Sequence, residues 1–400
     1  MGPVRYLLAA PQRWRRLTAS GSYVPQIDGL RFLAIAPVLM WHAGLRGQRM
    51  IEAGGGEASA MPWLPHGHVG VDLFFFISGY IIAYPFLAGK APGLVAFARR
   101  RLLRLEPPYL LVMVGCFLAL ALTGLQPTGA PSFYRTEAPL WQSLAASSVY
   151  MHGLIFNGEP RLNPPAWSLE VEIQFYILAP LLLFAYTRIR SRTARLWTGA
   201  ICVVFALVGG QWILDTLGYD NRVRWTLLTH AYPFLLGILV SDWAIEARPF
   251  EKEGSGLADL FGVLGLVLLL ATGLFEESRS LEVGLIKDSV RAVAILLIFW
   301  LACRGRIGRA ALGNGWIALI GGACYSIYLV HVPIMQAVTE VIVLLAPPTA
   351  GLGAWIWAVG ALIPAGLVGG LIFYVLIERP CTRPDWPARL AARLTGGRAG

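Results

Sequence analysis

The chain has 400 residues, of which 56% are hydrophobic and only 14% are charged, and its mean hydropathy is +0.60. Soluble globular chains have about 25% charged residues, so this composition excludes a soluble protein and predicts an all-α, polytopic membrane protein. The net charge of +10 does not indicate a nucleic-acid partner, because the basic residues lie in short loops between apolar segments, where membrane orientation accounts for them.

Neither the N-terminus nor the cysteines point to another class of protein. No small-residue cleavage site follows a short apolar run near the N-terminus, so we expect the first apolar segment to stay in the protein. The five cysteines include no pair in a candidate external loop, and none has the spacing to histidine that a zinc site needs. We therefore expect no disulfide framework and no bound metal.

Long apolar segments dominate the chain, and a helix needs about 20 mostly apolar residues to cross a membrane. The sequence predicts about ten such spans, at residues 28–45, 70–88, 109–125, 166–186, 196–214, 225–243, 257–275, 289–303, 316–345 and 353–377. The ninth is overlong and contains Pro333, so we expect a break or a kink there. The membrane domain then covers residues 27–378, between an N-terminal tail, 1–26, and a C-terminal tail, 379–400.

The lysines and arginines of the loops predict how these spans are oriented. If both ends of the chain are cytoplasmic, the inner segments contain 23 basic residues and the outer ones nine, with Arg31 inside the first span. Because cytoplasmic loops are enriched in Lys and Arg, this bias predicts an N-in, C-in topology with two cytoplasmic tails. Residues 126–165 are then the longest external segment, with a candidate interfacial helix at about 140–156.

The first span, IDGLRFLAIAPVLMWHAG, carries Arg31 near its start and His42 near its end. Their separation of eleven positions is about three helical turns, roughly 16 Å, so both side chains lie on nearly the same face, one near each membrane surface. Ionisable groups inside a membrane span are costly and indicate function by default. The alternatives are an arginine that reaches the lipid headgroups and a histidine bonded to a neighbouring helix.

Three acids are predicted at the outer level of His42. Asp72 opens VGVDLFFFISGY, in which Ser78 lies deeper, and Glu170 and Glu172 lie in the first turns of AWSLEVEIQFY. A carboxylate beside a histidine suits general-base chemistry, because it fixes the tautomer of the imidazole and stabilises the imidazolium that forms. The alternative for these acids is that they cap the N-terminus of a helix.

A cluster of arginines, AFARRRLLRLEPPY, is predicted on the cytoplasmic side. Arg101 and Arg104 are three residues apart and so share one helical face. The forked, always charged guanidinium suits phosphate recognition, and a coenzyme A thioester would fit such a site. Binding of anionic lipid headgroups by a cluster of this kind is the alternative, which the pattern alone favours.

The remaining histidines give weaker signals. His331 lies deep in the ninth span, in CYSIYLVHVPI, where a lone histidine is more often a hydrogen-bonded packing element than a catalyst. His66, His68, His152 and His230 lie in external loops or near the end of a span, and no pattern distinguishes them.

Together these stretches resemble the acyltransferase-3 family of integral membrane acyltransferases. Six motifs match in the family's order between about residues 25 and 378: IDGLRFLAIAPVLMWHAG, VGVDLFFFISGY, RRRLLRL, NPPAWSLEVEIQFYILAP, YPFLLGILVS and CYSIYLVHVPI. The resemblance implies a ten-span enzyme of a bacterial inner or plasma membrane. Such an enzyme would move an acyl group, often acetyl, from cytoplasmic acyl-CoA to a hydroxyl of a cell-surface glycan or lipid-linked glycan.

The resemblance also implies roles for single residues. It assigns catalysis to His42, paired with Arg31 in the motif, and donor binding to Arg101 and Arg104. The usual acid of the family aligns with Glu172, although position 173 is isoleucine where many members carry a second acid.

The implied mechanism treats acyl-CoA as a donor substrate rather than a permanent cofactor. Its pantetheine arm is expected to pass Ser78, and Asp72 or Glu172 to orient His42. His42 would deprotonate an acceptor hydroxyl or would itself be acylated transiently, and the sequence leaves both routes open. The extracytoplasmic hydrolase-like domain that some members carry is not recognisable here, which leaves open a partner that completes the transfer.

Two classes of function compete with this interpretation. A solute or glycan transporter also permits many spans with intramembrane charges, and within the enzyme class the acceptor could be a macrolide-type metabolite. An enzyme should bind coenzyme A thioesters through the arginine cluster, whereas a solute transporter should not.

Overall fold

The computed structural model describes residues 10–16, 23–56, 64–124, 138–275, 279–345, 351–383 and 386–387. Within these ranges the chain is all-α, as predicted, and its β pairing is one isolated parallel bridge between Ser255 and Gly305. Parts of the predicted tails and of the external segment 126–165 lie outside the described residues.

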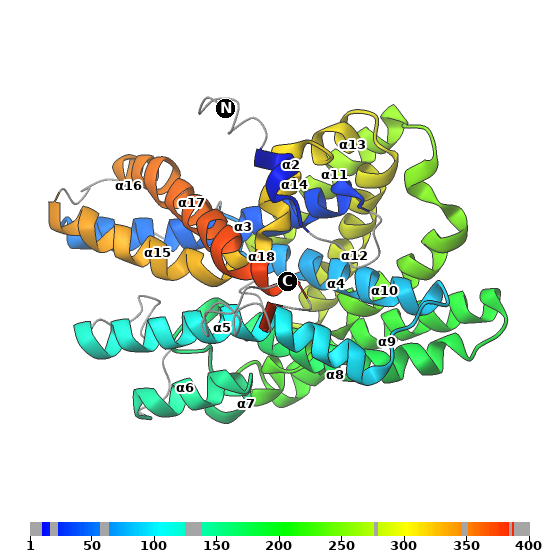
Figure 1. Cartoon of the computed structure of the whole chain (residues 1–400), viewed down its shortest axis with the longest axis horizontal. Coiled ribbons are helices and arrows are strands. Elements are labelled where there is room, and N and C mark those ends of the chain that lie inside the picture. The colour runs from blue at the N-terminus through cyan, green and yellow to red at the C-terminus, as the bar shows by residue number, and fades with distance from the viewer. Residues whose placement is uncertain are drawn as a thin grey trace, which may run out of the picture.

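The helices follow one another in a nearly continuous series along the chain (Figure 1). In order they are α2 (Ala10–Trp14), α3 (Pro25–Ala53), α4 (His68–Leu87), α5 (Leu94–Thr123), α6 (Leu140–Ser148), α7 (His152–Phe156), η2 (Pro164–Ala166), α8 (Trp167–Thr187), α9 (Arg192–Leu217), η3 (Arg222–Trp225), α10 (Leu227–Ala247), η4 (Pro249–Glu251), α11 (Gly256–Thr272), η5 (Gly273–Phe275), α12 (Leu281–Arg304), α13 (Ile307–Leu312), α14 (Gly315–Gly322), α15 (Cys324–Leu345), α16 (Gly351–Trp357), η6 (Ala358–Leu362), α17 (Ile363–Phe373), η7 (Tyr374–Glu378) and α18 (Arg379–Cys381).

The pattern of long apolar helices confirms a polytopic membrane protein. Among the described residues, eight helices are long and apolar enough to cross a bilayer. The other two predicted spans fall on α3 and α12, which have 29 and 24 residues but also carry several charged side chains. Those charges are largely buried inside the bundle, as Asp28, Arg46, Asp288 and Arg291 show.

The ninth predicted span is interrupted, but not at Pro333. The break lies at Ala323, between α14 and α15, and α15 continues through Pro333 to Leu345. Gly321 and Gly322 precede this break, and a side chain at Gly321 would collide with the backbone of Asp28 in α3. The expected break at Pro333 is therefore wrong; the chain turns where small residues let α14 pack closely on α3.

Four helices, α3, α4, α8 and α15, enclose the centre of the molecule. Helix α3 packs against α4, α14 and α15, and Figure 1 shows α15 lying alongside α3, with α17 against α15. Helix α8 contacts α4 and α10, and so closes the other side of the same region. The predicted interfacial helix at 140–156 forms as two pieces, α6 and α7, which lie along α5 and α8.

Helices α4 and α10 also cross in close contact. A Cβ atom at Gly79 would collide with the backbone carbonyl of Phe234, and one at Gly237 would collide with that of Phe76. Small residues at such crossings let helix backbones approach within a membrane. This contact fixes α4, the helix that carries Asp72 and Ser78.

Replacing Gly79 with alanine is expected to separate α4 from α10 and to destabilise the protein by about 1–3 kcal/mol, the usual effect of overpacking. The measurement is the thermal unfolding midpoint of the purified protein in detergent. Gly209→Ala on α9 is the matched control, because no atom lies within 4 Å of a Cβ built there. Equal midpoints for the two variants would contradict the close contact.

Candidate active site

A polar cavity lies where α3, α4, α5, α8 and α15 meet. Its lining includes the four predicted donor-binding residues and one of the predicted catalytic acids: Arg31, Ser78, Arg101, Arg104 and Glu172. It has an empty volume of about 490 Å³. We call it the arginine cavity.

Two of its arginines are held by buried carboxylates. Arg31 donates to Asp28, one turn earlier on α3, and Arg16 lies 3.7 Å from the same carboxylate. Arg104 lies 3.3 Å from Glu378 of η7, which is fully buried. Salt bridges inside the bundle offset the desolvation of these charges and fix where the guanidinium groups lie.

Arg101 is held differently. Its guanidinium lies over the rings of Tyr176 and Phe97, at 4.9 and 5.6 Å from their centroids. Among the described residues no carboxylate lies within ion-pair distance of Arg101. It is therefore a positioned cation whose charge is available to an anionic ligand.

Glu172 belongs to the arginine cavity rather than to the surroundings of His42. The hydroxyl of Ser78 donates to Glu172 at 2.6 Å, and the hydroxyl of Tyr176 donates to the same carboxylate oxygen. Our sequence-based depth assignment placed Ser78 below Glu172; the two side chains are in direct contact. The predicted contact between Glu172 and His42 is wrong, because His42 makes no hydrogen bond to a described residue.

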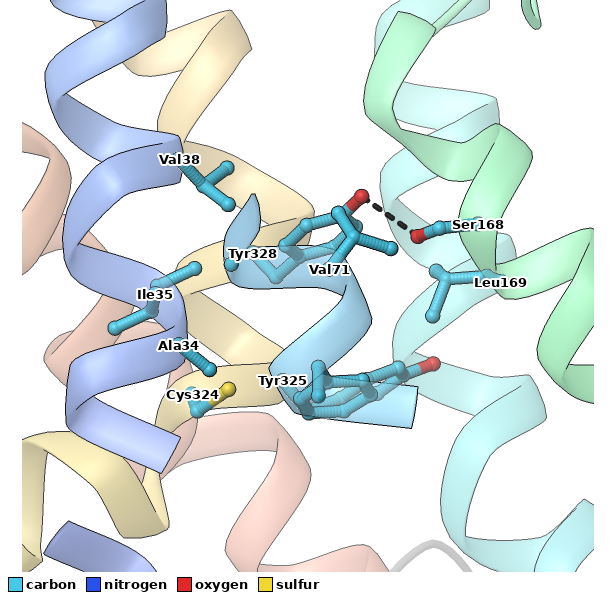
Figure 2. Close-up of a pocket in the computed structure, with 11 residues that line it drawn as sticks. Ala34, Ile35, Val38, Val71, Ser168, Leu169, Cys324, Tyr325 and Tyr328 are labelled. Carbon is cyan, nitrogen blue, oxygen red and sulfur yellow. Dashed lines mark hydrogen bonds between the residues drawn. The ribbon is translucent and has the colours of Figure 1, made fainter. Parts of the chain in front are cut away.

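An apolar cavity continues from the arginine cavity toward His42. It shares Phe74, Cys324 and Tyr325 with the arginine cavity and has an empty volume of about 340 Å³. We call it the apolar tract. Figure 2 shows its lining side chains converging from α3, α4, α8 and α15, with the hydroxyl of Tyr328 2.7 Å from that of Ser168.

Helical periodicity explains this alignment. On α3 the lining residues Ala34, Ile35 and Val38 lie between Arg31 and His42 on one face. On α15 the lining residues Cys324 and Tyr328 precede His331 on one face in the same way, and the Tyr328 ring lies 5.8 Å from the His331 ring. The tract therefore extends from the arginine cavity along the faces of α3 and α15 that carry His42 and His331, which lie one turn beyond its lining residues Val38 and Tyr328.

The two histidines face each other across α3 and α15. Their ring centroids are 5.1 Å apart in an edge-to-face arrangement. His331 is completely buried, and its Nδ1 lies 2.8 and 3.1 Å from the backbone carbonyl oxygens of Tyr328 and Ile327. A carbonyl only accepts, so Nδ1 carries the proton, and Nε2 is left as a buried lone pair with no partner among the described residues.

Asp72 is placed differently from our prediction. Its carboxylate lies 2.7 Å from Arg291 of α12, which also contacts Thr272 and lies 3.8 Å from Asp288. This network joins α4 to α11 and α12. The expected contact of Asp72 with His42 is wrong, because the carboxylate pairs with the buried Arg291 instead.

Glu170 is a helix cap, the alternative that the sequence had offered. Its two carboxylate oxygens accept the backbone N–H groups of His152 and Gly153, at 3.0 and 2.9 Å. The helix that it caps is α7, not its own helix α8. This contact fixes the external segment against the bundle.

Sequence reasoning missed Glu378 and ranked His331 low. Glu378 ends the last apolar run and was taken as the boundary of the membrane domain. A lone acid directly after an apolar span was a usable signal, since such residues usually pair inside the bundle. Ser326 of α15 donates two hydrogen bonds to the Glu378 carboxylate, from its backbone N–H at 3.2 Å and from its hydroxyl at 2.7 Å.

Comparison of the amino-acid sequence with known protein families identifies the same helices. The acyltransferase domain that defines one family of membrane proteins matches residues 24–375. The chain belongs to the acyltransferase-3 family. It is a multi-pass membrane acyltransferase, and the match covers the helices that build the arginine cavity, the apolar tract and the histidine pair.

Proteins similar to this chain include a membrane-bound transacylase and O-acetyltransferases. The membrane-bound transacylase BcsY of Komagataeibacter xylinus is 29% identical over 398 residues, which cover 97% of this chain and 91% of that protein. The peptidoglycan O-acetyltransferase OatA of Listeria monocytogenes is 26% identical over 82% of this chain, and OatA of Staphylococcus aureus is 27% identical over 80%. The match covers 52% of each OatA protein, so the chain spans about half their length. No solved structure matches the chain.

Among the described residues, no group of three or more His, Cys, Asp or Glu side chains is arranged to hold a metal ion.

One carboxyl group of the segment that we predict to be external has a raised pKa. Burial raises the pKa of Glu159, between α7 and η2, from 4.5 to about 7, and Arg224 opposes this rise. Because the folded protein binds this proton more tightly than the unfolded chain does, the contribution of Glu159 to stability is complete below pH 4.5 and is lost as the pH rises through about 7.

Glu159→Gln is therefore expected to unfold at a higher temperature than the wild type at pH 8.5 and at nearly the same temperature at pH 4.5. Thermal unfolding in detergent at several pH values measures this difference. The exposed Glu253→Gln is the control. A wild-type advantage that grows above pH 7 would contradict the assignment.

Proposed function

We propose that this enzyme transfers an acyl group, in the simplest case acetyl, from acyl-CoA to a hydroxyl group of a surface glycan or lipid-linked glycan. One observation carries the proposal: the apolar tract shares residues with the arginine cavity, and its lining on α3 and α15 reaches Val38 and Tyr328, one helical turn before His42 and His331. A phosphorylated donor and a proton-accepting residue thus have separate places, and the apolar tract lies between them.

The arginine cavity supplies the donor site in this proposal. Arg101 offers a guanidinium with no carboxylate partner among the described residues, and Arg31 and Arg104 extend the positive charge around it. Ser78 and Glu172 hold one wall by their mutual hydrogen bond. The phosphates of acyl-CoA would bind these arginines, and the thioester would enter the apolar tract. The excess of basic residues in the alternate loops supports placing this end at the cytoplasm.

His42 performs the transfer either directly, as a general base, or through an acyl-histidine intermediate. In the direct route the acceptor oxygen attacks the thioester carbonyl carbon, the C–S bond breaks, and His42 moves the hydroxyl proton to the coenzyme A sulfur. In the relay route a nitrogen of His42 attacks first and the imidazole proton goes to the departing sulfur. The acceptor oxygen then displaces the imidazole, which takes the hydroxyl proton. The ring of His42 has no hydrogen bond to a described residue, so either nitrogen is free to react.

His331 acts as the positioning residue that the sequence had assigned to a carboxylate. Its Nδ1 proton is held by two backbone carbonyls, so its Nε2 can only accept. A small rotation of either ring would let an N–H of His42 donate to this lone pair. That hydrogen bond would fix the tautomer of His42 and leave its other nitrogen bare to take a proton or to attack.

The glycan acceptor rests on the relatives. OatA of Listeria monocytogenes is named for O-acetylation of peptidoglycan, which supports a glycan hydroxyl as the acceptor here. A metabolite acceptor and a role in glycan transport are the competing functions. Acyl-CoA binding separates the enzyme from the transporter, and mass analysis of surface glycans with and without the gene product separates the two acceptors.

Arg101→Ala is expected to weaken acyl-CoA binding by about 10-fold to 150-fold, because a hydrogen bond to a charged group contributes about 1.5–3 kcal/mol. Binding of acetyl-CoA to purified protein, measured by calorimetry, tests this. Arg100→Ala is the matched control, since Arg100 is exposed and bonds only to the backbone of Ala96. If both variants bind acetyl-CoA as the wild type does, the donor site is elsewhere.

His42→Gln is expected to lower the transfer rate by at least about 100-fold while acetyl-CoA still binds, since general acid–base groups contribute roughly 10²–10⁴-fold. His331→Leu should lower kcat by about 10-fold without changing acetyl-CoA affinity, and His331→Gln, which can still accept a hydrogen bond, should recover part of it. Rapid quenching with radiolabelled acetyl-CoA shows whether His42 carries the acyl group. Full transfer by a folded His42→Gln variant would remove the assignment.

A further inference from the structure

A second cavity lies outside the arginine cavity and the apolar tract, between α10 and α12. Its empty volume is about 1120 Å³, more than twice that of the arginine cavity. Leucine and tryptophan side chains line most of it, including Leu239 and Trp243 of α10 and Leu296 and Trp300 of α12. We call it the lateral groove. The proposed transfer reaction makes no use of it.

Two basic side chains stand at one end of the lateral groove. Arg304 ends α12, and Lys252 follows η4. Arg304 is half-buried, and no described residue forms an ion pair with it. Its Nε is buried and has no hydrogen-bond partner among the described residues. A buried donor atom without a partner is unfavourable, and an anion bound at this partly exposed guanidinium would supply one.

The backbone around these two cations is fixed. The N–H of Ser255 donates to the carbonyl of Arg304 at 2.7 Å, and Arg309 donates to the carbonyl of Lys252 at 2.9 Å. Of the two acidic neighbours of Lys252, Glu251 pairs with Arg248 at 3.6 Å, and Glu253 is exposed to solvent. The end of the groove is thus a preformed basic platform.

The occupant must therefore combine an anionic head with an apolar body. Trp243 and Trp300 are 42% and 38% exposed, as is usual for tryptophans at the level of lipid headgroups. Both cations lie at the end of the bundle that our topology places at the cytoplasm, where the leaflet is rich in anionic lipid.

We propose that the lateral groove binds an anionic phospholipid. The phosphate contacts Arg304 and Lys252, and one acyl chain lies between α10 and α12 along Leu239 and Leu296. A zwitterionic lipid fits less well, because its ammonium group offsets the phosphate charge that these two cations would bind. Lipid binding in the lateral groove does not depend on transfer activity, so the two proposals can be tested independently of each other.

The test is native mass spectrometry of the full chain released from nanodiscs that contain equal amounts of phosphatidylglycerol and phosphatidylcholine. The wild type should retain phosphatidylglycerol at least fivefold over phosphatidylcholine. The double variant Lys252→Gln with Arg304→Gln should lose this preference. Arg188→Gln with Arg190→Gln is the control of equal charge, because both residues are exposed and outside the groove. Equal retention of the two lipids by the wild type, or an equal loss in both variants, would overturn the proposal.

A second measurement uses the wild type alone and does not require a variant to fold. Phosphatidylglycerol with a photoreactive group in one acyl chain should crosslink to α10 and α12 near Leu239 and Leu296. Labelling spread evenly over the outer helices, or competition by acetyl-CoA or by a lipid-linked glycan but not by phosphatidylglycerol, would overturn the assignment of the occupant.

Discussion

A charge inside a membrane bundle is stable only beside an opposite charge, and this constraint organises the whole structure. Arg104 and Glu378 join α5 to η7, and Asp72 and Arg291 join α4 to α12. Arg195 and Asp242 join α9 to α10 in the same way. These pairs leave Arg101 as a guanidinium of the cavity without a carboxylate partner among the described residues, although its neighbour Arg104 is paired.

Much of this organisation could be predicted from the sequence, because it depends on properties that are local along the chain. Apolar runs of about 20 residues located the helices, although α5 begins at Leu94, well before the predicted start at 109, and α3 continues to Ala53, beyond the predicted end at 45. The spacing of Arg31 and His42 placed them on one face of α3, where the apolar tract now lies between them. The four residues predicted to bind the donor, Arg31, Ser78, Arg101 and Arg104, line one cavity, and their role in donor binding stays a prediction.

The partners of buried acids could not be predicted, because pairing depends on how the helices rotate against one another. Asp72 and Glu172 were expected near His42 from their depth alone, yet one faces Arg291 and the other faces Ser78. The position of the break at Ala323 could not be predicted for a related reason. Proline marks a break within one helix, whereas here the close approach of α14 to α3 decides where the chain turns.

Because Arg31 and His42 lie on one face of α3, the helix fixes both the distance and the angle between them. One residue inserted between them would turn the histidine by about 100° and aim it away from His331, even if every side chain were kept. Four inserted residues would restore the face but lengthen the path by about 6 Å. Under the proposed function, the pitch of this one helix would set the reach from the phosphate site to the reactive carbon, and a donor with a shorter or longer arm would place its carbonyl out of register with His42.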